Sequence, residues 1–244
     1  VSIAAGFLVA FPWPMAAEVT SRRVIVMTSA DGHDLFRKGN LQLAPVAAKD
    51  MPANVIDAVL SIEDRRFYRH YGVDPLSMVR AFRANSEAGR VVAGGSTITQ
   101  QLVKILFLGP QRTYKRKLQE LPMSLWIEHH LTKDEILTSY LNNAYLGSGT
   151  LGFPAAAKVY FGKKVANLSL AEAAMLAGMI NAPSHDDPFH DLAAARKRAI
   201  SVIDAMVAGG KLTEEDALVA KLHPATPVAG VDHADPARPQ PLED

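Results

Sequence analysis

Two short polar clusters contain the side chains best suited to chemistry. The first is Glu63 with Asp64 and His70, and the second is Arg116-Lys117 followed by Glu120. A carboxylate can accept a proton, and a set of cations can neutralise an anionic leaving group. The combination predicts transfer of a sugar from a diphosphate.

Glu63 is the candidate general base. Its position continues the apolar stripe of a predicted helix, formed by Ile56, Val59 and Leu60. Burial and the negative end of the helix dipole should both raise its pKa, as a base working near neutral pH requires. The alternative is an ordinary ion pair of Glu63 with Arg65 or Arg66 at the helix end.

The neighbours of Glu63 are less specific signals. Asp64 by itself is compatible with either a functional or a structural role. His70 could serve as a ligand or a base, but a histidine two residues before the turn glycine Gly72 is more often a hydrogen-bonded structural residue.

A glycine-rich segment between the clusters predicts an anion site. Gly94-Gly95 frees the backbone to approach a ligand, and Thr97 can cap a helix that carries Lys104 within two turns. A helix start near a lysine suits a diphosphate, although the spacing of a nucleotide-binding P-loop is missing. The alternative is a hinge that leads into a core helix.

The basic cluster contains Arg112, Lys115, Arg116 and Lys117, with Glu120 one turn further on. Taken alone, it is typical of a charged surface. Beside the glycine segment and Glu63, it predicts neutralisation of a pyrophosphate leaving group. Glu120 would then orient the cations or assist departure.

Composition bounds these hypotheses. The 244 residues are 48% hydrophobic and 21% charged, which suits one principal domain. The net charge of +1 argues against a strongly basic nucleic-acid binder, so no nucleic-acid partner is expected. With no cysteine, the chain has no disulfide, thiolate metal site or cysteine nucleophile.

Four segments are predicted along the chain. Residues 1–17 carry no charge and are interpreted as the outer end of a truncated membrane anchor, with a signal-peptide remnant or a surface strap as alternatives. Residues 18–44 are predicted to form a β-hairpin that turns at Asp31-Gly32. Residues 45–222 form the main domain, and the proline-rich residues 223–244 form a tail or linker.

The main domain is predicted to be mainly helical. Helix starts are indicated by capping residues at Asp50, Asp74, Thr132 and Ser169, and a further helix is expected from Asp191 to Ala208. Stops are expected by Gly89, near Gly147, before Pro183 and at Gly209-Gly210.

The motifs together resemble those of the peptidoglycan glycosyltransferases. This is the family of the transglycosylase modules of class A penicillin-binding proteins and of monofunctional transglycosylases. The first four similar segments are Glu63-Asp64-x-x-Phe67-x-x-His70-x-Gly72, Gly94 to Gln101 with Lys104, Arg116-Lys117-x-x-Glu120, and Lys133-x-Glu135-Ile136-Leu137-x-x-Tyr140-Leu141-Asn142. The fifth region comprises Ala155 to Gly162, Leu168-Ser169, Glu172-Ala173-Ala174 and Ala182-Pro183. Five matching motifs in the same order as in the family are not expected by chance.

The resemblance implies a lysozyme-like, two-lobed helical fold with a membrane-facing smaller lobe. It implies polymerisation of lipid II into glycan strands with inversion, with release of undecaprenyl diphosphate, on the outer face of the bacterial cytoplasmic membrane. Lipid II, the growing lipid-linked glycan strand, the membrane and other cell-wall synthesis proteins are the implied partners.

Roles follow from the resemblance position by position. Glu63 would deprotonate the acceptor hydroxyl, and Glu120 matches the second essential glutamate. The positions that match substrate contacts are Asp64, Phe67, His70, Gly95, Ser96, Thr97, Gln101, Lys104, Arg112, Arg116 and Lys117. A divalent cation, Mg²⁺ or Mn²⁺, could assist, with Glu63 as its contact. Tyr140 and Asn142 are expected to hold the lobes together.

Three positions depart from the family pattern, and two other functions are alternatives. Ile105, Thr138 and Pro122 depart from the family pattern, and Pro122 interrupts the helix of Glu120. A muramidase-like hydrolase would need an acid for a sugar leaving group, and a silent scaffold would need no base. Without a Ser-x-x-Lys motif, no penicillin-binding nucleophile is visible.

Overall fold

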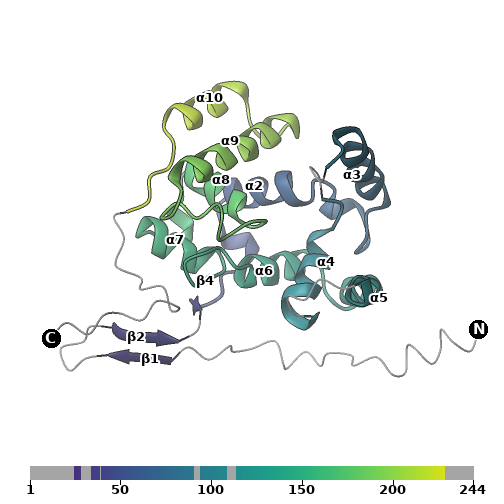
Figure 1. Cartoon of the computed structure of the whole chain (residues 1–244), viewed down its shortest axis with the longest axis horizontal. Helices are drawn as coiled ribbons and strands as arrows, with labels where there is room; N and C mark the ends of the chain where they lie inside the picture. Colours follow the sequence, from purple (N-terminus) through teal and green to yellow (C-terminus); the bar gives the residue numbers. More distant parts are fainter. Residues whose placement is uncertain (1–24, 29–33, 39, 91–93, 109–113, 229–244) are drawn as a thin grey trace, which may run out of the picture.

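The computed structural model describes residues 25–28, 34–38, 40–90, 94–108 and 114–228. These residues form a mainly helical domain with small strand pairs (Figure 1), which confirms the predicted fold class. The α-helices are α2 (Ala53–Glu63), α3 (Pro75–Ala88), α4 (Ile98–Val103), α5 (Tyr114–His130), α6 (Lys133–Asn143), α7 (Phe153–Phe161), α8 (Leu170–Met179), α9 (Leu192–Ala208) and α10 (Glu214–Leu222). A π-helical turn, Lys104–Leu108, extends α4. No helix in these described ranges is long and apolar enough to cross a membrane.

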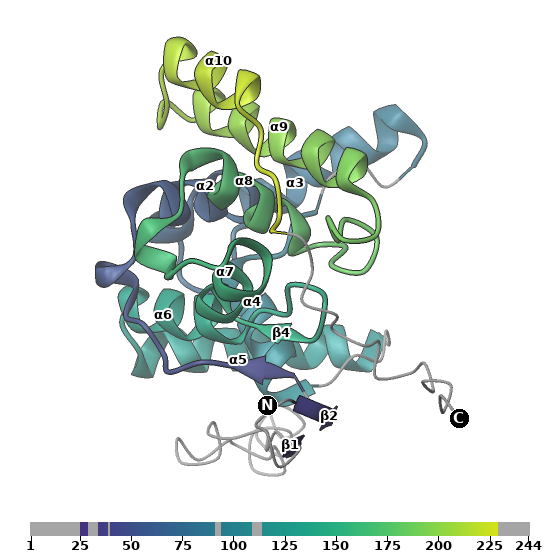
Figure 2. The same cartoon turned by 90° about the vertical axis from the view of Figure 1, so that its left-hand side faces the viewer.

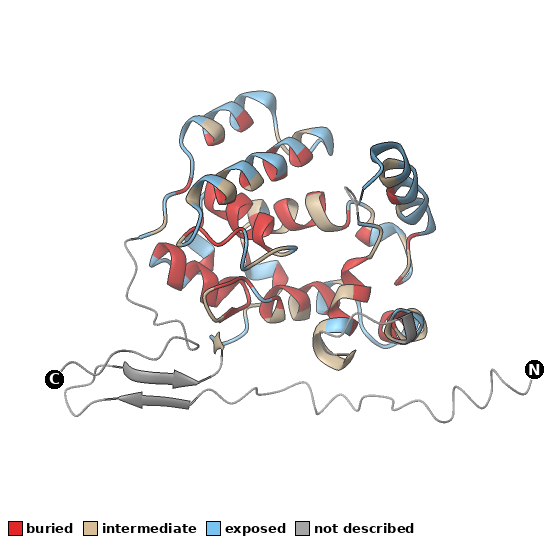
Figure 3. Cartoon of the chain, viewed as in Figure 1, coloured by how far each residue is buried: buried red, intermediate tan, exposed pale blue. Residues whose placement is uncertain are grey.

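The helices form two lobes. The larger lobe contains α2 and α6 to α10. Buried residues predominate in α7 and α8 (Figure 3), and α8 packs closely against α2 and α9. Helix α3 stands apart in the smaller lobe, and α4 lies between α3 and α5 in both views (Figures 1 and 2). The short α4 packs against both α5 and α6 and so joins the two lobes.

The strands are few and short. Strand β1 (Ile25–Thr28) pairs antiparallel with β2 (Asp34–Lys38), which confirms the hairpin, while its turn at Asp31-Gly32 lies outside the described residues. Strand β3 (Leu41–Gln42) pairs parallel with β4 (Thr150–Leu151), a contact that the sequence did not predict. This pair joins the segment after the hairpin to the larger lobe. The predicted anchor, residues 1–17, also lies outside the described residues.

Most predicted caps are present. The side chains of Asp74, Thr97, Thr132 and Ser169 each accept a backbone N–H in the first turn of a helix. Asp191 caps α9 in the same way, although the sequence predicted only that a helix begins there. Thr97, Thr132 and Ser169 form complete capping boxes. Helix α10, which the sequence analysis did not identify, begins with the same device, because Thr213 accepts the N–H of Asp216.

Two predicted boundaries are wrong. Asp50 belongs to a 3-10 turn and does not cap α2, whose N-cap is Pro52 without a side-chain bond. The proline keeps the preceding Met51 extended, so the helix cannot begin earlier. Helix α6 ends at Asn143 and not near Gly147, because the backbone becomes extended at Ala144 and Tyr145 bridges to Leu151.

The first residues of the predicted tail lie against the domain. Ala225 is buried, and its carbonyl accepts a hydrogen bond from Arg196 of α9 at 3.2 Å. The Val228 N–H donates to the carbonyl of Tyr160 in α7 at 2.8 Å. Residues 223–228 therefore strap α9 to α7, and residues 229–244 lie outside the described part.

Helix α3 is held by polar contacts more than by apolar ones. Within α3 only Ala81 is buried. Its N-cap Asp74 is buried and accepts from the Leu76 N–H and the Ser77 hydroxyl, and Arg66 forms an ion pair with it at 3.1 Å. Burial alone would raise the pKa of Asp74, but the hydrogen bonds from Ser77 and the charge of Arg66 outweigh it, and the pKa is lowered.

The turn before α7 depends on a glycine. Gly152 has φ 81° and ψ 157°, and a Cβ there would lie 2.5 Å from the Asn142 carbonyl oxygen. We expect Gly152→Ala to lower the free energy of unfolding by about 3 kcal/mol, because strain and a backbone clash combine. Gly89→Ala is the control: its φ is 63° but a Cβ meets nothing, so a loss of about 1 kcal/mol is expected. Equal urea midpoints for the two variants would contradict this explanation.

Candidate active site

Asp64 joins the end of α2 to the start of α4. Its Oδ2 accepts the N–H of Ile98, the first residue of α4, at 3.0 Å, and lies 2.9 Å from Nε2 of His70. The side chains of Asp64 and His70 are almost fully buried. A buried carboxylate at a helix N-terminus is stabilised by the unpaired N–H groups there. Asp64 and His70 therefore position α4, and the structural interpretation of His70 fits this geometry.

Both oxygens of the Glu63 carboxylate are held by side-chain amides. Gln101 of α4 donates from Nε2 to Oε2 at 2.8 Å, and Asn181, after α8, donates from Nδ2 to Oε1 at 2.7 Å. No ion pair of Glu63 with Arg65 or Arg66 is present among these contacts; Arg65 donates to the carbonyl of Ser61 and Arg66 pairs with Asp74. The carboxylate is thus fixed by neutral donors.

Tyr140 is a third residue that supports this arrangement, through Gln101. The hydroxyl of Tyr140 in α6 donates to Oε1 of Gln101 at 2.9 Å. A chain of hydrogen bonds therefore runs from Tyr140 through the Gln101 amide to Glu63.

The environment of Glu63 raises its pKa. Removal of the carboxyl from water is the main cause, and hydrogen bonds from Gln101 and Asn181 oppose it, as do the charges of Arg198 and Lys104. Arg198 reaches the site from α9, where its Nε donates to the Gly178 carbonyl at 3.2 Å. A carboxylate with a raised pKa that remains ionised near neutral pH suits general base catalysis.

The glycine segment packs tightly before α4. A Cβ at Gly95 would lie 3.0 Å from the Cα of Met78 in α3, so a glycine lets the loop pass close to that helix. Thr97 is buried, and its hydroxyl donates to the Gly72 carbonyl at 2.7 Å. Gly95 and Thr97 therefore shape the segment, while Ser96 remains partly exposed.

The second cluster forms around Glu120. Glu120 is 3% exposed, and its carboxylate accepts from Arg116 at 2.6 Å and from Lys117 at 2.7 Å. Lys117 also donates to the hydroxyl of Ser96 at 3.0 Å, which joins the cluster to the glycine segment. Helix α5 continues through Pro122, so the proline does not separate Glu120 from Arg116 and Lys117.

Lys104 lies in the electrostatic field of both glutamates. Burial of part of the side chain lowers its pKa, as does repulsion by Arg116 and Lys117, while Glu120 and Glu63 raise it. The residue itself is solvent-exposed. Its charge therefore interacts with both halves of the site.

Phe67 is buried in the core. Its ring is 1% exposed in the core, and Nζ of Lys133 lies 4.5 Å from the ring centroid. The ring thus supports the turn that carries His70. Arg112 lies outside the described residues.

The predicted site residues that meet in space are Glu63, Gln101, Lys104, Ser96, Arg116, Lys117 and Glu120. The sequence analysis did not identify Asn181 or Arg198 as members of the site. Asn181 directly precedes the matched Ala182-Pro183, and that position was the only signal that could have indicated it.

The predicted divalent cation does not fit Glu63 as it is arranged. Both carboxylate oxygens accept from amide N–H groups, and the nearest charges are cationic. In the part of the chain that the structure describes, no group of three or more His, Asp or Glu side chains could hold a metal ion. We therefore derive no catalytic step through a metal.

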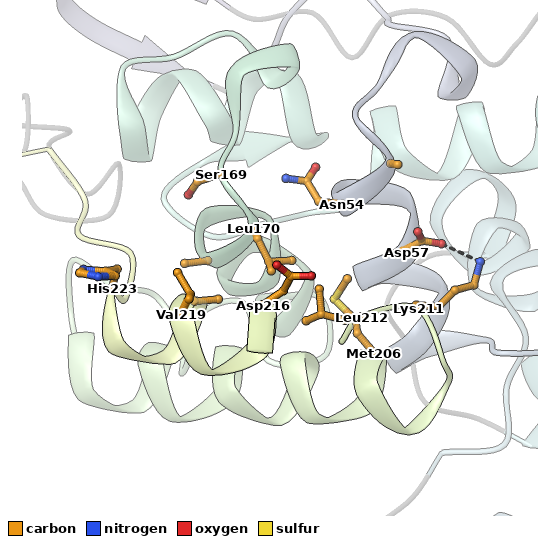
Figure 4. Close-up of a pocket in the computed structure, with 13 residues that line it drawn as sticks. Asn54, Asp57, Ser169, Leu170, Met206, Lys211, Leu212, Asp216, Val219 and His223 are labelled. Carbon is orange, nitrogen blue, oxygen red and sulfur yellow. Dashed lines mark ion pairs between the residues drawn. The ribbon is translucent and has the colours of Figure 1, made fainter. Parts of the chain in front are cut away.

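A pocket of about 480 Å³ lies at the opposite end of α2, under α10 (Figure 4). Its lining includes Leu170, Met206 and Leu212, and Lys211 pairs with Asp57 at its edge at 2.9 Å. None of the predicted site residues lines it. The candidate active site is therefore defined by its hydrogen bonds and charges and not by this pocket.

Comparisons with known proteins agree with the resemblance. Penicillin-binding protein 1A of Aquifex aeolicus is 47% identical over 170 residues, which are 70% of this chain and 23% of that protein. Penicillin-binding protein 1A of Escherichia coli is 42% identical over 187 residues, which are 77% of this chain and 22% of that protein. The chain thus spans less than a quarter of the length of these relatives.

A solved structure and a family model complete the comparison. The 2.6 Å crystal structure of penicillin-binding protein 1A from Haemophilus influenzae has a TM-score of 0.52 and 22% identity, covering 87% of this chain and 22% of that one, and shows the fold alone. A family model described as Transglycosylase matches residues 32–207. The chain belongs to the transglycosylase family of glycosyltransferases.

Proposed function

We propose that this domain is a peptidoglycan glycosyltransferase that polymerises lipid II into glycan strands and releases undecaprenyl diphosphate. The family and the penicillin-binding relatives support the reaction class. The observation that carries the proposal is the position of Lys104 in the fields of both Glu63 and Glu120. Lys104 thus lies between a poorly solvated base, Glu63, and the cluster of cations around Glu120.

The proposed reaction is a single displacement. Glu63 accepts the proton of the acceptor sugar's 4-hydroxyl as that oxygen forms a bond to the donor's anomeric carbon. The bond from this carbon to the diphosphate oxygen breaks, and the electron pair leaves with the diphosphate. Attack opposite the leaving group inverts the anomeric centre.

Cations take the place of a catalytic acid. The diphosphate leaves as an anion, so it needs charge neutralisation and not a proton. Lys104, Arg116 and Lys117 are the described cations suited to this task, and Glu120 holds the latter two in place. A hydrolase would need an acid to protonate a sugar leaving group, whereas the described acid Glu120 is engaged with Arg116 and Lys117.

We further propose that α3 contacts the outer face of the cytoplasmic membrane. Leu76, Met78, Val79 and Phe82 are between 45% and 75% exposed, although they are large and apolar. Such a surface is typical of an interface with lipid or protein. A lipid-linked substrate requires the site to lie near the bilayer, and α3 contacts the glycine segment at Gly95.

Glu63→Gln is expected to lower lipid II polymerisation by about 10³-fold, because a general base contributes that order of rate. Glu214→Gln, which changes an exposed glutamate of α10, should retain full activity. Gel analysis of products from purified lipid II measures both variants, and shortening of added glycan in place of polymer growth would indicate a hydrolase. Unchanged turnover of Glu63→Gln would refute the assigned base.

The stability of Glu63→Gln should equal or exceed that of the wild type. A glutamate whose folded pKa is raised loses stability as pH rises above its unfolded value, so ionised Glu63 costs stability at neutral pH. A neutral amide removes that cost. A melting temperature clearly below that of the wild type would show that Glu63 has a structural role.

The pH profile should report Glu63. Because the base must be ionised, kcat should fall as pH drops through its raised pKa, above the range of an ordinary glutamate. Asn181→Ala removes a hydrogen bond that lowers this pKa, so the acidic limb should move to higher pH. Asn143→Ala is the control, since Asn143 bonds Ser139 and Gln42 instead. Identical profiles for all three proteins would exclude this part of the mechanism.

Liposome binding tests the α3 surface. Replacing Val79 and Phe82 together with serine should weaken binding to vesicles at least about tenfold, because each lost apolar side chain removes about 1.5–3 kcal/mol of burial. A matched pair, Leu218 and Leu222 of α10, has similar exposure. Its replacement by serine should leave binding unchanged. Equal losses for both pairs would argue against a specific membrane face.

A further inference from the structure

The hydroxyl of Tyr140 is a buried polar group without direct access to substrate. The residue is 0% exposed, and its hydroxyl donates to Oε1 of Gln101 at 2.9 Å. Burial keeps the pKa of Tyr140 well above its ordinary value, as do the charges of Glu63 and Asp64, so the hydroxyl remains a donor. The sequence analysis assigned Tyr140 only to contact between the lobes.

The direction of this donor decides the orientation of the Gln101 amide. With Oε1 toward Tyr140, Nε2 donates to Oε2 of Glu63 at 2.8 Å, and all three groups are satisfied. A reversed amide would place its oxygen against the carboxylate oxygen and leave the buried hydroxyl without its acceptor. Two facing oxygens form a hydrogen bond only if Glu63 carries a proton, and a protonated Glu63 cannot act as the general base.

We propose that Tyr140 is a positioning residue for the general base: its hydroxyl fixes the Gln101 amide, which in turn fixes the Glu63 carboxylate in the position where it accepts the proton of the acceptor hydroxyl. This inference rests on the proposed function. Asn181 holds the other carboxylate oxygen at 2.7 Å, so two elements fix its plane. Tyr140 acts through Gln101 and touches neither substrate nor the reacting atoms.

Kinetics of Tyr140→Phe test this role. The substitution deletes one oxygen and leaves the ring in place, so both amide orientations become available. We expect kcat to fall about tenfold with KM within about twofold of the wild type, because base geometry and not substrate binding is affected. Tyr160→Phe is the matched control: Tyr160 is equally buried, but its hydroxyl bonds Leu146 and Asp187. Its kcat should stay within about twofold.

A double-mutant cycle separates positioning from a general structural effect. If Tyr140 acts through the amide, Tyr140→Phe should cause no further loss in a Gln101→Leu background. An additional loss of the same size in that background would overturn the proposal. Equal effects of Tyr140→Phe and Tyr160→Phe on kcat would overturn it as well, because they would reflect packing alone.

A second readout does not depend on activity. In ¹⁵N-labelled protein, the side-chain amide of Gln101 is assigned by its loss in Gln101→Leu. The wild type should show one slowly exchanging pair of amide protons, and Tyr140→Phe should show faster exchange. Fast exchange in the wild type would overturn the proposal even if Tyr140→Phe does not fold. Absence of polymerisation by the wild type would instead refute the proposed function, while this amide measurement would still decide the role of Tyr140.

Discussion

The contact between Asp64 and the first N–H of α4 is the interaction on which the site depends. It places the last residue of α2 beside α4, and Glu63 consequently meets Gln101 across 38 residues of sequence. The segment before α4 also carries Ser96, which bonds Lys117 of the second cluster. One short helix and its preceding loop therefore position both carboxylates.

The two glutamates have opposite environments. Glu63 is surrounded by neutral amides and by cations that do not form a close pair with it, so its carboxylate keeps the ability to accept a proton. Glu120 is buried between Arg116 and Lys117 and is committed to them. Two chemically identical groups are thus suited to different roles because their partners differ.

Local signals made the fold largely predictable, while the finer site geometry was not. Caps such as Thr97 and Thr132 act within one helical turn, so their sequence spacing is sufficient to predict them. The prediction that Asp50 caps α2 was wrong because Pro52 keeps Met51 extended, so the helix begins after the proline. Asn181 bonds Glu63 from 118 residues away in the sequence, and Tyr140 bonds Gln101 from 39 residues away. Hydrophobic periodicity gives no indication of such long-range pairs.

The way in which α3 is attached has a consequence for its behaviour in acid. Asp74 has a lowered pKa, so its contribution to folding is complete above the ordinary aspartate range and disappears as pH falls through the folded value. Protonation weakens the cap and the tie to Arg66 at once, whereas the apolar contacts between α8 and α9 do not titrate. Partial unfolding at low pH should therefore begin at α3 and release this helix before the rest of the domain.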